Sequence, residues 1–355
     1  MRRALALLLV ITCVALSLAG CGGSSAPAPT PGQSGADSSG GAPAEVKKGE
    51  FVMKMGYGAA PGHPIDLGSQ EFKKLVEERT NGRVEVRLFP SAQLGSERQT
   101  IEGLQTGTFE GTPTTTGPMG MFDNKFMLFD LPYMFRSYEA ADQVLDGEIG
   151  DELFAGLEEI GLVGLAWWET GFRQLSNNKR EVVTPADAAG LKLRVMENEV
   201  HMDFWKGLKT TPVAMGFGEI YMACKSGTVD GQDNPISLYV SNKFYEVQNY
   251  VTMTDYVYSP VPVLVSKIWW DTLPEDIQKI LKDTAYEVRI MQREAVRTMD
   301  EDYIKTAEAN GTKVTRLTEE QKGVWKEEAL KVYPKFEEKI GKDLLYKAFE
   351  VSWGK

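Results

Sequence analysis

The sequence predicts an α/β protein built of two domains, each with a sheet covered by helices. Its 355 residues are more than one ordinary core accommodates, which favours two domains. Two separate stretches, residues 51–116 and 190–235, repeat strand and helix segments at the length typical of parallel sheets. The hydrophobic fraction of 42% and the charged fraction of 25% are those of a soluble globular protein.

The first 21 residues are expected to be an export signal rather than part of the fold. A short basic start precedes an apolar run over residues 4–18, which is too short to span a bilayer comfortably. Leu-Ala-Gly-Cys at residues 18–21 resembles a bacterial lipobox, in which Cys21 is acylated and becomes the mature N-terminus. The alternative is an ordinary signal peptide in which Cys21 is incidental.

Residues 22–48 are nearly all Gly, Ser, Ala or Pro, so they cannot bury enough apolar surface to fold. We expect a disordered tether between the lipid anchor and the folded chain. Cleavage before Cys21 would leave Cys224 as the one free thiol, which excludes a disulfide framework.

The first repeated stretch alternates between strand and helix patterns. Its apolar spacing predicts a strand over residues 51–58, a helix over 65–80, a strand over 84–88, a helix over 97–105 and a polar strand over 107–116. Ligands of open α/β sheets lie beyond the carboxyl ends of the strands, so Tyr57, His63 and Thr115 are candidate pocket residues. Ordinary packing is the alternative for all three.

The middle of the chain is strongly apolar. It predicts a core turn over residues 128–135, one or two amphipathic helices over 138–160, and a strand buried on both faces over 162–168. Trp168, Glu169 and Arg173 come at the end of this strand. They indicate either an aromatic and ionic lining for a polar ligand or a packed strand exit with a local salt bridge, and composition alone favours packing.

The stretch 190–235 reads as strand, helix, strand, helix, strand, with residues 230–235 leaving the sheet edge as a polar loop. Arg194, Phe217 and Asn234 fall at strand ends, where a ligand would lie. A guanidinium meets a carboxylate through two parallel hydrogen bonds, which Lys cannot do, so Arg194 is the first candidate for binding an acid. The alternative is a strand Arg in a surface ion pair.

The last third of the chain crosses back between the domains and then becomes helical. Extended apolar segments over residues 251–266 are expected to make the crossing. One apolar face runs from Pro274 to Asn310, which predicts a helix of about 54 Å, longer than one domain is wide. Two helices broken near Arg293 are the alternative. The tail to Lys355 is expected to be amphipathic helix that forms a solvated cover.

The residue counts exclude several partners and chemistries. With 39 basic and 50 acidic residues, neither a nucleic acid nor an anionic membrane surface is expected as a partner. His63 and His201 are the two histidines, which excludes a histidine-rich metal site. No phosphate-binding loop, G-x-S-x-G or C-x-x-C motif occurs, so no cofactor, metal or catalytic residue is expected.

Three motifs, in order, resemble one family. They are GLKLRVMEN at residues 190–198, F-x-E at 217–219 and SGTVDGQDNP at 226–235, and QLG at 93–95 and KFYEVQ at 243–248 extend the likeness. The family is the solute-binding proteins of TRAP (tripartite ATP-independent periplasmic) transporters, dicarboxylate type. The resemblance covers most of the exported chain. It implies a two-lobed periplasmic-binding-protein fold, with two α/β domains joined by crossover strands and a long spanning helix.

The resemblance also implies roles for the candidate residues. Arg194 would hold the ligand carboxylate, and Arg173 a second oxygen or the same charge. Asn234 would supply a further hydrogen bond, while Phe217 and Trp168 would form apolar walls.

Three positions depart from the pattern of the family. Met196 and Gly216 stand where the family often has Pro. Sialic-acid binders carry a Glu near the place of Thr115, so sialic acid is not expected as the ligand.

The implied function is that of an exported, lipid-anchored receptor that binds a small organic acid between its domains and delivers it to an ion-coupled TRAP permease. The expected domains are residues 49–170 with about 260–290, and residues 171–259 with about 291–355. A monomer is expected. The alternatives are a protein that presents its ligand to a chemoreceptor or sensor kinase, and a secreted carboxylate-based enzyme that acts on organic acids.

Overall fold

The computed structural model of the chain describes residues 47–354. The expected signal segment with Cys21, and the expected tether as far as residue 46, lie outside the described residues. Within residues 47–354, every helix is too short or too polar to cross a membrane.

The described strands join into a mixed sheet. Along the main path the order is β2-β1-β3-β9-β4-β7-β5-β6, and β8 pairs with β4 and with β10. The strands are β1 Phe51–Gly56, β2 Val84–Phe89, β3 Gly111–Pro113, β4 Leu162–Asn177, β5 Lys192–Val195, β6 Thr211–Ala214, β7 Gly231–Pro235, β8 Tyr250–Met253, β9 Tyr258–Ser266 and β10 Lys313–Arg316.

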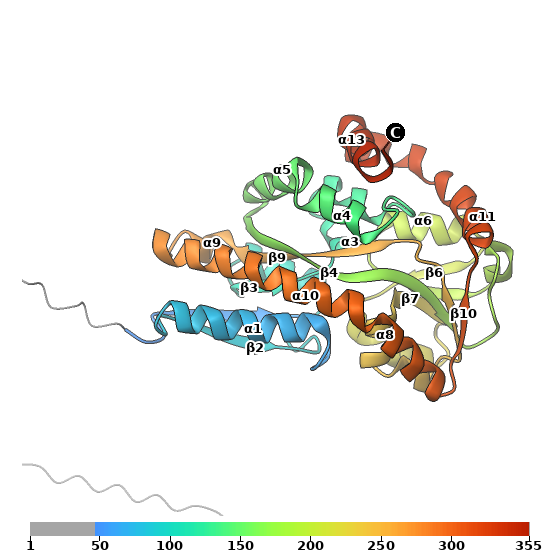
Figure 1. The fold of residues 1–355 in the computed structure, drawn as a ribbon, viewed down its shortest axis with the longest axis horizontal. Helices are drawn as coiled ribbons and strands as arrows, with labels where there is room; N and C mark the ends of the chain where they lie inside the picture. The colour runs from blue at the N-terminus through green and yellow to red at the C-terminus, as the bar shows by residue number, and fades with distance from the viewer. Residues whose placement is uncertain (1–46, 355) are drawn as a thin grey trace, which may run out of the picture. The chain divides into compact units, whose positions relative to one another are not determined.

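Each repeated stretch forms parallel strands, as predicted, but the two stretches are joined by antiparallel ones. Strand β1 lies parallel to β2 and β3, and β5 lies parallel to β6 and β7. Between these groups, β9 and β4 run antiparallel, so β4 pairs with β9 along its first part and with β7 and β8 along its last. Strand β4 therefore belongs to both halves of the sheet (Figure 1).

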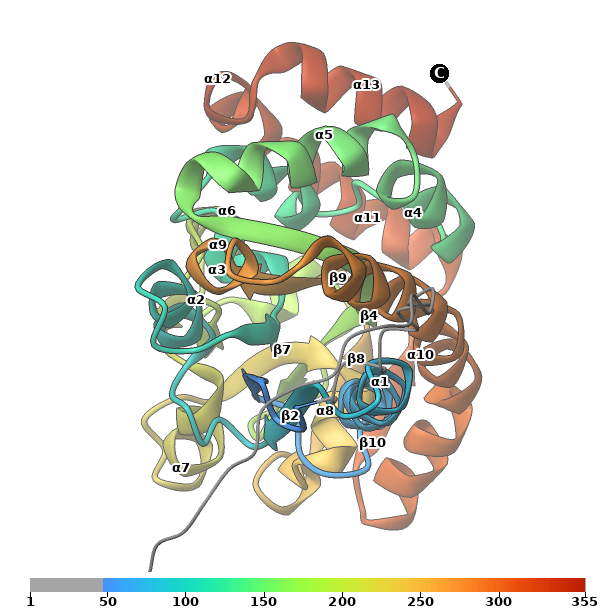
Figure 2. The ribbon, with the colours of Figure 1, turned by 90° about the vertical axis from the view of Figure 1, so that its left-hand side faces the viewer.

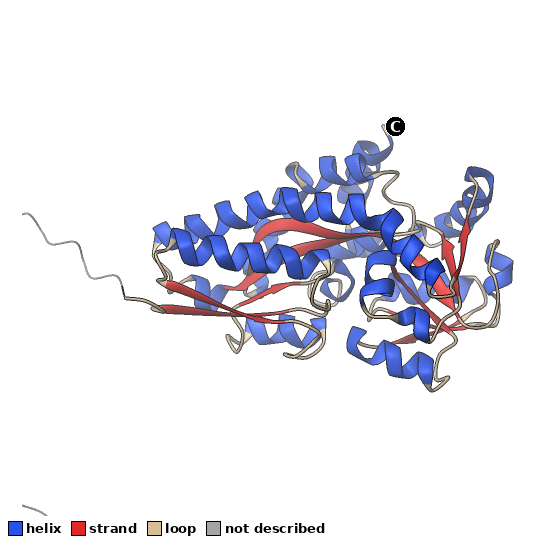
Figure 3. Cartoon of the chain, turned by 60° about the horizontal axis from the view of Figure 1, so that its bottom comes forward, coloured by secondary structure: helices blue, strands red, loops and turns tan. Residues whose placement is uncertain are grey.

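The helices cover the sheet and bracket its ends (Figures 2 and 3). They are α1 Pro64–Arg79, α2 Glu97–Gln105, α3 Thr116–Met119, α4 Tyr138–Leu145, α5 Glu148–Gly156, α6 Glu199–Gly207, α7 Ile220–Lys225, α8 Ile236–Ser241, α9 Lys267–Trp270, α10 Glu275–Ala309, α11 Glu319–Leu330, α12 Glu337–Ile340 and α13 Lys342–Trp353. The predicted strand over residues 107–116 was too long, because Pro113 cannot extend the ladder and α3 begins at Thr116.

Helix α10 is one continuous helix of 35 residues, so the alternative of a break near Arg293 was wrong. At 1.5 Å per residue it is about 52 Å long. It lies beside α1 and β4 near its start and reaches α8 and β10 near its end (Figure 1). The helix therefore connects the two halves of the sheet along their length.

Arginines spaced four residues apart fix α10 to the rest of the fold. Arg293 Nη1 lies 2.7 Å from Asp142 Oδ1 in α4 and 2.8 Å from Oδ2 of Asp146, which caps the end of α4. Arg297 Nη2 lies 2.7 Å from Asp142 Oδ1 and 2.7 Å from the buried Glu169 Oε2 of β4. These pairs are partly buried and share carboxylates, so they form a network rather than isolated surface ion pairs.

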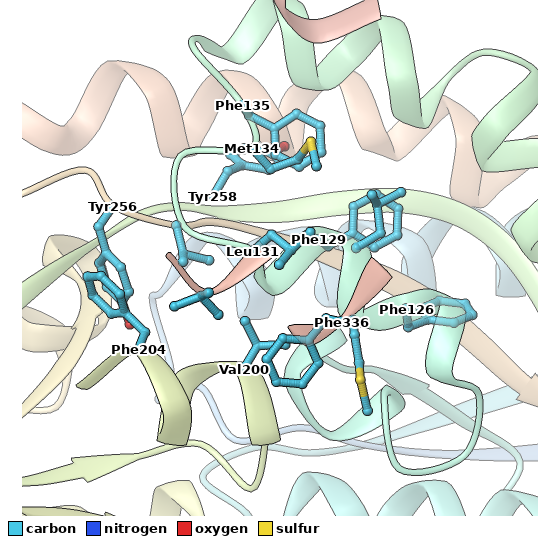
Figure 4. Packing of buried hydrophobic residues seen from close by; sticks show 14 of the residues in the cluster. Phe126, Phe129, Leu131, Met134, Phe135, Val200, Phe204, Tyr256, Tyr258 and Phe336 are labelled. Carbon is cyan, nitrogen blue, oxygen red and sulfur yellow. The ribbon is translucent and has the colours of Figure 1, made fainter. Parts of the chain in front are cut away.

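The largest buried apolar cluster lies between the sheet and helices α3–α6 and α11–α13. The predicted core turn over residues 128–135 is buried in it, as expected. The C-terminal tail is more than the solvated cover that the sequence predicted, because Trp325, Phe336 and Leu345 lie inside the cluster. Figure 4 shows Phe336 and Val200 among its side chains.

Asp300 of α10 is expected to make the stability of the fold depend on pH. Burial, with the nearby charges of Asp255 and Glu169, raises the pKa of Asp300 to about 7. A raised pKa stabilises the fold below the ordinary carboxyl pKa of about 4, and this contribution is lost as the pH rises through about 7. We expect Asp300→Asn to raise the free energy of unfolding more at pH 8 than at pH 5, by at least about 1.4 kcal/mol, which is one pKa unit.

Chemical denaturation at both pH values measures this difference. Asp302→Asn is the control for the substitution itself, because the Asp302 side chain is 78% exposed on the same helix. An equal effect of Asp300→Asn at the two pH values would show that the Asp300 carboxyl titrates alike in the folded and unfolded chain.

Candidate ligand-binding site

A cavity lies where the ends of β1, β5 and β7 meet the middle of β4 and β9. The volume open inside it is ≈ 30 Å³, so in this structure it is a narrow space with room for a few water molecules. The lining residues are Tyr57, Gly58, Ala59, Ile65, Glu97, Pro113, Thr115, Thr170, Arg173, Arg194, Met196, Phe217, Asn234, Leu238 and Val261.

Arg194 reaches the cavity from the end of β5. Parallel pairing of β5 with β6 and β7 fixes its backbone, and Nε donates a hydrogen bond to the carbonyl oxygen of Met215 at 3.0 Å. The residue is only 2% exposed, and Nη1 is buried with no hydrogen-bond partner among residues 47–354. A buried donor without a partner is costly, so this guanidinium is arranged to receive an acceptor from the cavity.

Within residues 47–354, the charge of Arg194 also forms no ion pair. Burial lowers the pKa of Arg194 to about 10, a shift that the more distant Asp233 and Glu97 offset only in part. The group remains protonated at neutral pH, yet the described part of the chain places no carboxylate in an ion pair with it. A carboxylate bound in the cavity would complete both the charge and the hydrogen bonding of Arg194.

Arg173 differs, because its counter-ion is part of the protein. From the middle of β4 it donates from Nε to Asp233 Oδ2 at 2.8 Å, and from Nη2 to the Asp233 carbonyl at 2.6 Å and to Asn234 Oδ1 at 3.3 Å. Although burial alone would lower it, the carboxylate of Asp233 holds the pKa of Arg173 above its ordinary value. Arg173 therefore lines the cavity with its charge already compensated.

A buried polar network stands behind Arg173. Asp233 Oδ2 also accepts a hydrogen bond from the hydroxyl of Tyr256, which lies 3.1 Å from His201 Nδ1. The other ring nitrogen of His201 lies 3.1 Å from Asp130 Oδ1. Burial alone would raise the pKa of Asp233, but Arg173 and His201 hold it well below its usual range. The network keeps the Arg173 guanidinium in one orientation.

Glu97 brings a negative charge to the same cavity. It begins α2 directly after Ser96, whose hydroxyl accepts from the backbone N–H of Gln99 in a capping box. Glu97 Oε1 accepts hydrogen bonds from the Thr115 backbone N–H at 2.8 Å and from the Thr115 hydroxyl at 2.9 Å. No hydrogen bond to Glu97 Oε2 occurs within residues 47–354, so this oxygen is available to a ligand.

Two close contacts cross the mouth of the cavity. A Cβ on Gly58 would lie 3.3 Å from Phe217 Cδ1, so the Phe217 ring rests against the backbone that follows β1. A Cβ on Gly117 would lie 2.4 Å from the end of Met196, so the Met196 side chain packs directly against the backbone at Gly117. The side that carries Tyr57 and the side that carries Arg194 are therefore in close contact beside the cavity.

A comparison with protein families identifies the family of this chain. Residues 55–339 match the model described as bacterial extracellular solute-binding protein, family 7. The chain belongs to the TRAP transporter solute-binding protein family. Proteins of this TRAP family are extracytoplasmic and bind solutes, which confirms the family that the motifs predicted.

Known TRAP solute-binding proteins and their relatives resemble the chain over most of its length. A solute-binding protein of Verminephrobacter eiseniae is 38% identical over 297 residues, which are 83% of this chain and 88% of the relative. The C4-dicarboxylate-binding periplasmic protein DctP of Rhodobacter capsulatus is 34% identical over 299 residues, 83% and 89% of the two chains.

A solved structure confirms the predicted two-lobed fold class. The sugar acid binding protein of Advenella mimigardefordensis, crystallised in complex with galactonate, matches the chain with a TM-score of 0.84 and 34% identity. The match covers 87% of this chain and 99% of that one.

Six of the nine predicted site residues of this TRAP protein line the cavity. They are Tyr57, Thr115, Arg173, Arg194, Phe217 and Asn234. The remaining three, His63, Trp168 and Glu169, are buried but do not line it. Sequence reasoning missed Glu97, although the acidic residue that follows the QLG phrase was a usable signal.

The three residues outside the cavity have structural partners. His63 caps α1, because its Nδ1 accepts from the backbone N–H of Ile65 at 3.1 Å, and burial lowers the pKa of His63 to about 3. The indole N–H of Trp168 donates to a carbonyl of α10 at 3.2 Å. Glu169 is held by Arg297 and by the Tyr258 hydroxyl at 2.6 Å. Packing, the alternative, describes Trp168, whereas the ion pair of Glu169 is with Arg297, 128 residues away, and is not the local salt bridge of that alternative.

The predicted polar loop over residues 230–235 was also wrong, because Gly231–Pro235 forms the fully buried strand β7 between β4 and β5. Its polar side chains could be buried because each finds a partner inside the fold. Asn234 Nδ2 donates to Gln232 Oε1, and Asn234 Oδ1 accepts from Arg173. The side chain of Asn234 thus lines the cavity while bonded to its neighbours.

Proposed function

We propose that this chain is the receptor of a TRAP transporter that captures a small organic acid in the cavity and delivers it to the membrane permease. The observation that carries the proposal is the buried guanidinium of Arg194, which has an unpartnered Nη1 and no counter-ion of its own among the described residues. A ligand carboxylate would supply both. The relatives named above bind a C4-dicarboxylate and galactonate, which are both organic acids.

Four of the lining residues then have roles in binding. Arg194 pairs with the ligand carboxylate, and Arg173 offers the nitrogen that its own partners leave free. Asn234 orients Arg173, while Phe217 covers the ligand as an apolar wall.

We propose that the ligand is trapped between the two domains predicted from the sequence. Tyr57, Glu97 and Thr115 belong to the first of these domains, and Arg194, Phe217 and Asn234 to the second. The volume inside the cavity, ≈ 30 Å³, is small for an organic acid, so binding requires the two sides to separate and close again around the ligand. Helix α10, which runs along both, limits this motion to a bend.

The cellular setting completes the proposal. The chain is exported, is anchored by a lipid on Cys21 and acts as a monomer that binds ligand without converting it. Delivery to a permease rests on the family, and finding genes for two membrane subunits next to this one would support it over presentation to a chemoreceptor or sensor kinase. A neighbouring receptor or kinase gene in place of those subunits would favour that alternative.

Mass spectrometry of small molecules released by denaturing the purified protein tests the proposal. We expect a small organic acid at about one molecule per chain, and we expect calorimetry to show that it binds without turnover. A co-purified ligand without a carboxylate, or the appearance of product during incubation, would overturn the receptor function.

A further inference from the structure

We infer that the ligand is a hydroxylated monocarboxylate, with its carboxylate on Arg194 and a hydroxyl group on Glu97. This inference rests on the proposed function and narrows its substrate class. It sets the ligand apart from a plain dicarboxylate.

The positive side chains of the cavity limit the number of ligand carboxylates that it can bind. Among its described lining residues, Arg173 and Arg194 are the two positive groups. Arg173 is bonded to the Asp233 carboxylate at 2.8 Å, with both side chains 1% exposed, so this charge is already compensated inside the protein. Arg194 is in no ion pair among the described residues and can pair with one ligand carboxylate, whereas a second ligand carboxylate would find no free cation and would add to the negative charge of Glu97.

Glu97 favours a hydrogen-bond donor over a carboxylate on its side of the cavity. Its carboxylate lines the same cavity, and the two hydrogen bonds from Thr115 to Oε1 hold it in place. A second ligand carboxylate on this side would be repelled by Glu97. The free Oε2 is an acceptor, so the group that it binds must be a hydrogen-bond donor.

A hydroxyl group fits this acceptor better than an ammonium group does. A hydroxyl brings one donor, which matches the one carboxylate oxygen without a partner. An ammonium group brings three donors and a full charge, which costs far more to remove from water, and the walls formed by Ile65, Leu238 and Val261 are apolar. The Thr115 hydroxyl is already used, since it donates to Glu97.

Calorimetry with matched acids tests the inference. The four-carbon set is erythronate, butanoate, succinate and 4-aminobutanoate, and the six-carbon set is galactonate, hexanoate and adipate. Within each set we expect the hydroxylated monocarboxylate to bind at least about tenfold more tightly than the unsubstituted acid, as expected for one hydrogen bond to a charged group. We expect the dicarboxylate and the amino acid to bind more weakly than the hydroxy acid.

A Glu97→Gln variant tests the assigned contact. Gln keeps an oxygen for the Thr115 hydrogen bonds but replaces Oε2 by an N–H₂ donor, so it reverses the preference of this position. We expect it to weaken binding of the hydroxy acid at least about tenfold, and to leave succinate and adipate binding equal or tighter. Glu102→Gln is the control, because Glu102 lies on the same helix in an exposed ion pair with Arg98.

The outcomes separate this inference from the proposed function. Tighter binding of the dicarboxylate or of the amino acid than of the hydroxy acid would overturn the inference and keep the carboxylate receptor. Equal binding of the hydroxy acid by the wild type and Glu97→Gln would remove Glu97 from the site. Failure of every acid in both sets to bind would overturn the proposed function itself.

Discussion

Arg194→Lys is expected to weaken binding of the organic acid at least about tenfold while leaving the fold intact. Lysine keeps the positive charge but offers a single ammonium group in place of the planar pair of donors. Losing one charge-assisted hydrogen bond costs about 1.5 kcal/mol or more, and about 1.4 kcal/mol corresponds to a tenfold change in dissociation constant. Calorimetry with the tightest-binding acid of the matched sets measures the change.

A second Arg→Lys variant controls for the substitution itself. Arg87 also lies on a strand, with its side chain 52% exposed and paired with Glu85 at 2.8 Å outside the cavity. Arg87→Lys should therefore leave the dissociation constant unchanged, since an exposed pair contributes little. Unchanged affinity in Arg194→Lys, with the same unfolding temperature as the wild type, would remove Arg194 from its role as the carboxylate anchor.

Asp233→Ala is expected to lower the free energy of unfolding by about 3–5 kcal/mol. The variant leaves the Arg173 guanidinium buried without its counter-ion and also removes the acceptor used by Tyr256. Because the pKa of Asp233 is held well below its usual range in the fold, its contribution is complete above about pH 4 and is lost as the pH falls further. Chemical denaturation at pH 7 and at decreasing pH measures both effects.

The matched control removes an exposed carboxylate from an ion pair. Asp283 of α10 pairs with Lys279 at 2.7 Å, and their side chains are 58% and 75% exposed. Asp283→Ala should cause no resolvable loss of stability. If Asp233→Ala were as stable as Asp283→Ala, Asp233 would not be the counter-ion of Arg173. Arg173 could then pair with a second ligand carboxylate, which would contradict the inferred preference for a monocarboxylate.

Local patterns predicted the regular elements well. The helix over residues 97–105 begins and ends where expected, because a capping box at its start is visible in the sequence. Helix α10 is continuous because its apolar period runs unbroken through most of its length, with Gln292 as the interruption. That polar residue has a partner far away in the chain, since its amide bonds to the backbone of Glu169 at 3.0 and 2.7 Å.

Long-range pairing explains the failures. Residues 231–235 look like a loop because they are polar, and they become a buried strand only because β4 and β5 flank them in the sheet. Trp168 and Glu169 were candidates for a ligand lining although composition alone favoured packing, and α10, more than 100 residues later, provides partners for both. No local spacing reports such partners, because burial and hydrogen bonding depend on which segments meet.

The sequence by itself determined the α/β class, the long connecting helix, the family and the choice of two candidate arginines. It could not show which of the two arginines has a counter-ion inside the protein, since both are strand residues with similar neighbours. The antiparallel pairing of β4 with β7 brings Asp233 against Arg173, 60 residues apart in the chain, and leaves Arg194 with no such partner in the described fold. Only tertiary structure decides this, because a counter-ion is defined by proximity in space.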